Sequence, residues 1–223
     1  MQITSELTGD VALITMDDGK KNAITPQAIA DLNTAFDGAE SDAKAVVLAG
    51  RPGSFCAGFD LSIMTGGDMD AIRELAKAAG EFAVRLWSFP KPLVAACTGH
   101  TFTIGAIWLC SCDSRIGDRG PFKIGMTETK MGMTFTPWAL EPLSHRLSKQ
   151  HWIPSIVQAR VHDPDGALEA GFLDEVVDDG QAVDRAMAIA TELAQLPAQA
   201  YAANKLMTRA ESIDIARADV ARL

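Results

Sequence analysis

The sequence predicts an α/β fold with a helical carboxyl-terminal region. Short apolar segments typical of buried strands alternate with segments of helical periodicity through the first two thirds of the chain, and the last third has the pattern of helices alone. The 223 residues, of which 48% are hydrophobic and 22% charged, can bury a sizeable core. We place a core domain at residues 1–195 and a separate helical segment at residues 196–223.

The first elements are predicted from turn, cap and periodicity signals. Residues 3–7 and 11–17 flank the turn Thr-Gly-Asp and predict a strand hairpin. Thr25 followed by Pro26 predicts a helix start, because threonine caps a first turn and proline fits within it. Two further elements are an apolar strand at residues 45–50 and a long helix at residues 70–89, which has one apolar face and stops at Pro-Lys-Pro.

The same signals predict the rest of the chain. Residues 93–99 are typical of a buried strand, and residues 104–113 are apolar on every side, as in a central helix. The later elements are two strands at 114–118 and 122–126, a helix end, strand and turn within 170–180, and two final helices at 182–197 and 198–220.

Charge and hydropathy argue against several classes of partner. The formal net charge is −9, whereas nucleic acids and anionic membranes bind basic surfaces. The amino terminus has no basic segment followed by an apolar block, so we expect no signal peptide. No run approaches the length of a membrane span. We therefore expect a cytoplasmic protein without nucleic-acid or membrane partners.

The four cysteines predict buried free thiols. They lie in apolar segments without the spacing of a zinc site, and no histidine completes a ligand pattern near them. Disulfides are also not expected in a reducing compartment. The sequence therefore predicts no metal site; the residues are Cys56, Cys97, Cys110 and Cys112.

Two segments share one design, in which an apolar strand runs through a glycine-containing turn into a helix. They read "AVVLAGRPGSFCAGFDL" and "LVAACTGHTFTIGAIWL". The first N–H groups of a helix lack partners and lie at the positive end of its dipole, so two converging helix starts could hold an oxyanion. Gly58 and Gly105 would let the backbone approach a ligand closely. By pattern alone, ordinary strand-to-helix turns are the simpler interpretation.

Three segments together resemble the crotonase superfamily, the enoyl-CoA hydratase and isomerase group. They are "GSFCAGFDL", "TGHTFTIGAIWLCSCDSRIG" and "FKIGMTETKMGM". The resemblance spans about residues 2–210 and implies a crotonase-like spiral of ββα units. It implies an acyl-CoA thioester as substrate, with coenzyme A as part of the substrate and no separate cofactor. It also implies a homotrimer or a dimer of trimers, although the trimerisation region is shortened here.

The resemblance implies two backbone N–H donors for the thioester oxygen. The first is the N–H of Phe59, after the "AG" pair. The second falls in the turn "TIG" and points to Ile104, with Gly105 as the alternative. The family usually has glycine at the Ile104 position, and isoleucine narrows the backbone angles allowed there.

Glu128 is the candidate base. Hydratases of this family carry two glutamates, and the position of the first is Ile107 here, which cannot transfer a proton. The second matches Glu128 in "GMTETKMG", closest to the isomerase form of that segment. A solvated loop carboxylate is the alternative, but the apolar neighbours favour a desolvated carboxyl with a raised pKa.

A single carboxylate favours an isomerase. Moving a double bond from the 3,4 to the 2,3 position needs one base, which removes a proton from C2 and returns one to C4, whereas hydration normally uses two groups. The alternatives are an enoyl-CoA hydratase and a non-catalytic CoA-binding homologue. Thioester hydrolysis or decarboxylation on the same oxyanion hole also stays open.

Further residues match positions that border coenzyme A in the family. The lysines among them offer the local positive charge that an acidic protein needs to bind phosphates. Lys20 is equally consistent with a solvated turn. The candidates are Lys21, Asn22 and Ala23 in the early loop, Ala57, Asp60 and Leu61 around the first donor, and Lys205 near the carboxyl terminus.

Overall fold

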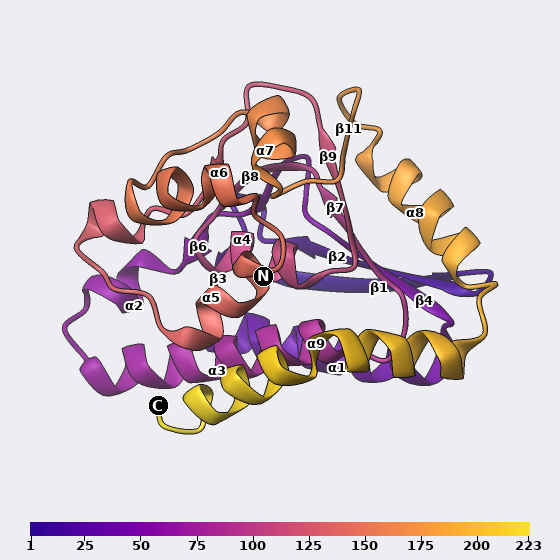
Figure 1. The fold of residues 1–223 in the computed structure, drawn as a ribbon, viewed down its shortest axis with the longest axis horizontal. Coiled ribbons are helices and arrows are strands. Elements are labelled where there is room, and N and C mark those ends of the chain that lie inside the picture. The colour runs from indigo at the N-terminus through magenta and orange to yellow at the C-terminus, as the bar shows by residue number, and fades with distance from the viewer.

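A six-stranded sheet, almost entirely parallel, forms the centre of the computed structural model, which describes residues 1–223 (Figure 1). Only the first pair is antiparallel, and it is the predicted amino-terminal hairpin. The buried apolar strands predicted at residues 45–50 and 93–99 are confirmed, and they end one and two residues earlier than expected. In spatial order the strands are β1 (Gln2–Thr8), β2 (Val11–Asp17), β4 (Ala45–Ala49), β7 (Leu93–Cys97), β9 (Ser114–Asp118) and β11 (Glu175–Val177).

Two smaller sheets continue the strands of the large one. Strands β5 (Gly53–Cys56), β8 (Gly99–Phe102) and β10 (Ile124–Gly125) form a parallel three-stranded sheet, and β3 (Ala23–Ile24) pairs with β6 (Gly58–Phe59). A strand of the large sheet, a strand of a small sheet and a helix therefore follow each other repeatedly. The two strands predicted at 114–118 and 122–126 exist but belong to different sheets, and the second is only two residues long.

The helices surround this strand framework. The start of α1 is as predicted, because the Thr25 hydroxyl accepts a hydrogen bond from the Ala28 N–H and Pro26 lies in the first turn. The helices are α1 (Pro26–Asp42), α2 (Leu61–Thr65), α3 (Met69–Ser88), α4 (Ile104–Ser111), α5 (Pro137–Ser144), α6 (Lys149–Trp152), α7 (Pro164–Ala170), α8 (Ala182–Leu193) and α9 (Ala198–Val220), with a 3₁₀ turn η1 (Glu128–Met131) and a π-helical turn η2 (Ile153–Val157).

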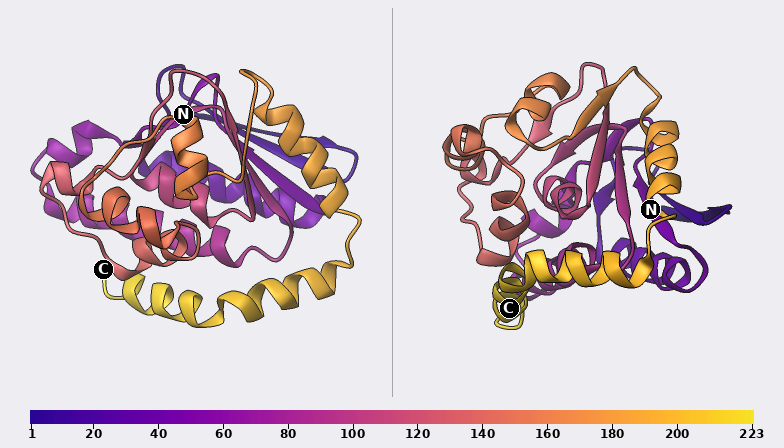
Figure 2. Two further views of the ribbon diagram at one scale, coloured as in Figure 1. Left: turned by 45° about the horizontal axis from the view of Figure 1, so that its top comes forward. Right: turned by 45° about the vertical axis from the view of Figure 1, so that its right-hand side comes forward.

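The two faces of the large sheet bury different helices. Successive strand side chains point to opposite faces, so Val46 and Leu48 pack into the main core while Val47 and Ala49 pack against α8. Helix α8 runs along the strands of the large sheet (Figure 2). All eight residues of α4 are buried, as expected for a helix that is apolar on every side. This burial fixes the position of α4 relative to the strands that lead into it.

The last helix, α9, packs against other helices of its own chain. Helix α9 lies beside α3 and α5, and the predicted domain boundary after residue 195 falls in the turn between α8 and α9 (Figure 1). None of the helices combines the length and the apolar character that a membrane crossing requires.

Candidate active site

A cavity of about 330 Å³ lies where the two strand-to-helix corners meet. Most of its lining is apolar, and Glu128 is the one side chain in it that ionises in the ordinary pH range. An apolar cavity with few polar groups is typical of a small-molecule site. It is lined by Ala57, Gly58, Phe59, Leu61, Met64, Phe102, Thr103, Thr127, Glu128, Met131 and Met133.

The first corner brings the backbone around Phe59 to this cavity. The N–H groups of Ala57 and Asp60, on either side, donate to the carbonyls of Lys21 and Ile24 at 3.0 Å and fix the local chain path. Gly58 has a φ of +107°. A Cβ added there would lie 2.5 Å from the Thr103 Oγ1 atom, so the position requires glycine.

The second corner is the start of α4. Ile104 and Gly105 are its first two residues, so no carbonyl within the helix is available to their N–H groups. A Cβ on Gly105 would lie 2.6 Å from the Cys56 Cβ atom and 2.7 Å from the Cys56 carbonyl oxygen. The helix therefore begins directly against β5, and the structure brings the two predicted corners together.

Glu128 is buried as the sequence predicts. It opens η1, its side chain lines the cavity, and only 9% of the residue is exposed. Its Oε2 atom has no hydrogen-bond partner. Burial raises the pKa of the Glu128 carboxyl to about 7, against a smaller opposing effect of the backbone N–H groups of Glu128 and Thr127. The group can therefore exchange a proton near neutral pH.

No second carboxylate faces Glu128 across the cavity. Ile107, at the position of the hydratases' other glutamate, is buried in the core within α4. Any proton transfer in this cavity therefore depends on one carboxyl group.

A second hollow of about 810 Å³ adjoins the first and shares Ala57, Phe59 and Leu61 with it. It brings together most of the residues predicted to border coenzyme A, and Lys20 and Lys21 supply positive charge beside Asp18 and Asp60. Its lining is Met1, Asp18, Lys20, Lys21, Ala23, Thr25, Ala57, Phe59, Asp60, Leu61 and Ser62.

Asn22 does not face this hollow. Its side chain is fully buried, and the Nδ2 group donates to the carbonyls of Met16, Ser54 and Phe55. With a φ of 55°, Asn22 turns the chain between Lys21 and Ala23. The Asn22 side chain therefore holds the loop in place and does not lie where the predicted contact with coenzyme A would need it.

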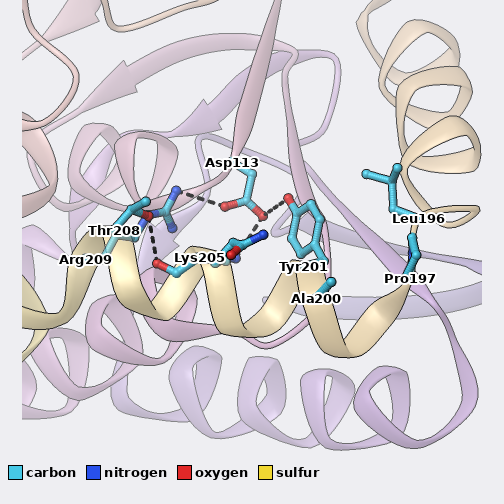
Figure 3. A pocket seen from close by; sticks show the side chains of 9 residues that line it. Asp113, Leu196, Pro197, Ala200, Tyr201, Lys205, Thr208 and Arg209 are labelled. Atoms are coloured by element: carbon cyan, nitrogen blue, oxygen red, sulfur yellow. Dashed lines mark hydrogen bonds and ion pairs between the residues drawn. The ribbon is translucent and has the colours of Figure 1, made fainter.

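Lys205 is not brought to either hollow. It lies on α9, where its Nζ atom donates to Asp113 at 2.8 Å, and the side chain is 5% exposed (Figure 3). Asp113 also accepts from Tyr201 and Arg209, and the Arg209 guanidinium lies 3.8 Å from the centre of the Trp87 ring. Burial lowers the pKa of Lys205, while Asp113 opposes the shift. Within one chain, Lys205 therefore anchors α9 to the core.

The four cysteines are free and buried, as predicted. Cys56 lies next to the first corner, but burial raises the pKa of its thiol to about 12. A thiol at that pKa stays protonated at neutral pH and is a poor nucleophile.

Some cavity residues were not identified from the sequence. The cavity lining by Met64, Met131 and Met133 depends on how α2, η1 and the residues just after η1 pack, which no local pattern shows. Thr103 was detectable, since it opens the "TIG" turn that replaces a glycine-rich turn of the family. Its place in the cavity is visible only in the structure.

A family model described as enoyl-CoA hydratase/isomerase matches residues 6–220. The chain belongs to this family. Among relatives, the human mitochondrial enoyl-CoA delta isomerase 1 is 26% identical over 203 residues, which cover 89% of this chain and 67% of the human protein. The enoyl-CoA hydratase/isomerase family is one of enzymes, and the predicted membership is confirmed.

Solved structures of the enoyl-CoA hydratase/isomerase family confirm the crotonase-like fold. A member from Pseudomonas syringae is 37% identical with a TM-score of 0.95, covering 99% of this chain and 95% of that one. EchA3 from Mycobacterium tuberculosis, titled a probable enoyl-CoA hydratase, is 36% identical with a TM-score of 0.94, covering 98% and 92%. A second structure of that protein is titled an enoyl-CoA isomerase. The names of similar proteins therefore divide between the two reactions.

Proposed function

We propose that this protein is an enoyl-CoA isomerase that moves the double bond of a 3-enoyl-CoA to the 2,3 position. The observation that carries the proposal is the single carboxyl group in the cavity, Glu128, with Ile107 in place of a second one. One base suffices for the double-bond shift. Proteins named isomerases among the relatives and structures agree with this choice.

The two corners would supply the oxyanion hole. The substrate's thioester oxygen binds between the backbone N–H groups of Phe59 and Ile104, with Gly105 as the alternative second donor. Each donor in such a site contributes about 3–4 kcal/mol to stabilising the transition state. This stabilisation is needed because a carboxylate is a weak base for a C–H bond beside a thioester.

Glu128 would then carry the proton. As a carboxylate it accepts a proton from C2, and the electrons of the broken C–H bond delocalise over the thioester oxygen and the neighbouring double bond. The protonated carboxyl returns the proton to C4, which leaves a 2,3 double bond and regenerates the base. A pKa of about 7 suits both steps at neutral pH.

The adjoining hollow would hold coenzyme A as part of the substrate. Lys20 and Lys21 provide positive charge for its phosphates in a protein whose net charge is −9. The acyl chain then extends along the apolar lining of the first cavity, where Met64, Met131 and Met133 adapt to its shape. No further cofactor takes part in this mechanism.

A hydratase is the second candidate, favoured by the similarity to EchA3 from Mycobacterium tuberculosis, which is named a probable enoyl-CoA hydratase. In that reaction Glu128 alone would activate water for addition to a 2-enoyl-CoA. Because hydration also requires a proton at the neighbouring carbon, the same carboxyl would have to serve both steps. The missing partner at Ile107 makes this reaction the less favoured one.

Separate incubation with 3-enoyl-CoA and 2-enoyl-CoA tests the choice. We expect a shifted double bond from the first and no 3-hydroxyacyl-CoA from the second. Glu128→Gln should lower turnover by orders of magnitude with little change in acyl-CoA affinity. Glu169→Gln, at an exposed position of α7, is the matched control and should leave turnover unchanged. Full activity of Glu128→Gln would remove this residue from the mechanism, and water addition alone would establish the hydratase.

A further inference from the structure

Thr103 has a backbone conformation that favours glycine. Its φ is 52° and its ψ is −119°, and it is one of three non-glycine residues with positive φ, with Asn22 and Ala159. A β-branched residue in this region costs about 1–3 kcal/mol and persists only where the surrounding structure holds it. Here the Thr103 N–H donates to the Gly125 carbonyl, and its carbonyl accepts from Ala106 and Ile107.

The Thr103 side chain lies between the two corners of the site. It is half-buried and lines the same cavity as Phe59 and Glu128. Its Oγ1 atom is so close to Gly58 that a Cβ there would lie 2.5 Å away. Gly58 precedes Phe59 and Thr103 precedes Ile104, so the hydroxyl is next to both proposed donor amides.

The Thr103 hydroxyl has no partner within the protein. It does not cap α4, and the Oε2 atom of Glu128 has no hydrogen-bond partner either. No histidine lines the cavity, and the Oε2 atom of Glu128, the base in it, accepts no hydrogen bond from this hydroxyl. Its proton is therefore available to a molecule bound in the cavity.

We propose that the Thr103 hydroxyl is a third hydrogen-bond donor to the carbonyl oxygen of the bound thioester. This rests on the proposed function in that the substrate oxygen occupies the space between the two corners. A donor aimed at this oxygen stabilises it more strongly as it becomes an enolate, so Thr103 acts mainly on turnover. The strained backbone at position 103 is then the cost of placing a hydroxyl beside both proposed donor amides.

Three variants separate the hydroxyl from the backbone. Thr103→Ser keeps the hydroxyl, Thr103→Val removes it with nearly the same shape, and Thr103→Gly removes it and relieves the positive φ. We expect kcat for 3-enoyl-CoA to fall about 10- to 100-fold in the valine and glycine variants, with KM changed less than about threefold. The serine variant should stay within about threefold of the wild type. Thr103→Gly should match or exceed the wild type in Tm, because glycine adopts this conformation without strain.

An infrared measurement reads the hydrogen bond without turnover. A hydrogen bond lowers the C=O stretching frequency of a thioester, so butyryl-CoA labelled with ¹³C at the carbonyl is bound to each protein. The wild type and Thr103→Ser should show a lower frequency than Thr103→Val and Thr103→Gly. If Thr103→Val does not fold, the C=O frequency in Thr103→Gly alone tests for the hydrogen bond.

The outcomes distinguish this proposal from the proposed function. A wild type that does not isomerise 3-enoyl-CoA but shows the Thr103-dependent frequency shift would retain the hydrogen bond and refute the isomerase. Isomerisation with unchanged kcat and frequency in Thr103→Gly would refute the third donor and retain the isomerase. Failure of the wild type to bind butyryl-CoA would overturn both.

Discussion

At the scale of residues, the ionisation of Glu128 depends on its burial in an apolar cavity. The carboxyl is largely removed from water, and one of its oxygens has no partner, so the neutral form is favoured. The same feature that suits proton transfer therefore weakens the folded state when the group ionises. Both consequences can be measured.

The first consequence of the burial of Glu128 concerns turnover. Below pH 7 the fraction of Glu128 in the carboxylate form falls tenfold per pH unit, so kcat/KM should fall with the same slope, with an apparent pKa of about 7. Above that pH the profile should level off. Initial rates on 3-enoyl-CoA between pH 5.5 and 8.5 give the profile. An acid limb near the ordinary pKa of glutamate would show that the carboxyl is solvated or is not the base.

The second consequence of the burial of Glu128 concerns the stability of the folded protein. The folded-state pKa of Glu128 lies above its unfolded value, so the native protein holds the extra proton between about pH 4.5 and pH 7, and the free energy of unfolding decreases across that range. A shift of this size is worth up to about 3 kcal/mol. Glu128→Gln cannot ionise, so its stability relative to the wild type should rise from pH 5 to pH 8. Urea unfolding at both pH values measures the difference, and an equal difference at each would contradict the burial of the charge.

The residues of the site were predictable to different degrees. Phe59, Ile104 and Glu128 lie in motifs, so the sequence could single out these positions; in the structure Phe59 and Glu128 line one cavity, and Ile104 opens α4. The inward turn of Asn22 and the ion pair of Lys205 depend on long-range contacts, of Asn22 with Ser54 and of Lys205 with Asp113. Such contacts leave no periodic signal in the chain.

At the scale of elements, the close approach of α4 to β5 forms the site. The elements themselves follow from caps and periodicity, as the start of α1 at Thr25 and Pro26 shows. The lengths of the small strands could not be predicted from such local signals. Strand β10, for example, is two residues long and is held by its pairing with β8. The contact between α4 and β5 likewise depends on Gly105, whose packing against Cys56 is visible only in three dimensions.

Gly105→Ala tests this contact. The added methyl group would meet Cys56 at 2.6 Å and displace the start of α4, so we expect a loss of about 1–3 kcal/mol in the free energy of unfolding. Turnover should fall as well, because the helix start carries a proposed donor. Gly38→Ala is the control, since Gly38 is exposed within α1 and has no atom within 4 Å of an added Cβ. It should stabilise the protein slightly. Equal effects of the two changes would argue against the close approach.

At the scale of the whole molecule, α9 is held to the rest of the chain through Asp113. This carboxylate follows α4 at the end opposite the cavity and pairs with both Lys205 and Arg209 (Figure 3). Two cations that are almost fully buried thus share one anion. A buried charge left without its partner is strongly destabilising.

Asp113→Asn should therefore cost about 3–5 kcal/mol in the free energy of unfolding, measured with urea. Asp10→Asn removes the partner of Lys44 in an exposed pair, and it should change stability by less than about 1 kcal/mol. A similarly small effect at Asp113 would mean that the remaining contacts of α9, such as the hydrogen bond from Trp87 to Ser212, hold the helix without it.

The burial of all four cysteines has a practical consequence for following this molecule in solution. The thiolate is the form of cysteine that attacks an alkylating reagent, and burial raises the pKa of the Cys97 thiol to about 11 and that of the Cys112 thiol to about 12. Each adduct formed in native buffer therefore records an opening of the chain around one of these side chains. Mass spectrometry of alkylated peptides over time would report, site by site and without added labels, how often the interior of this protein becomes accessible.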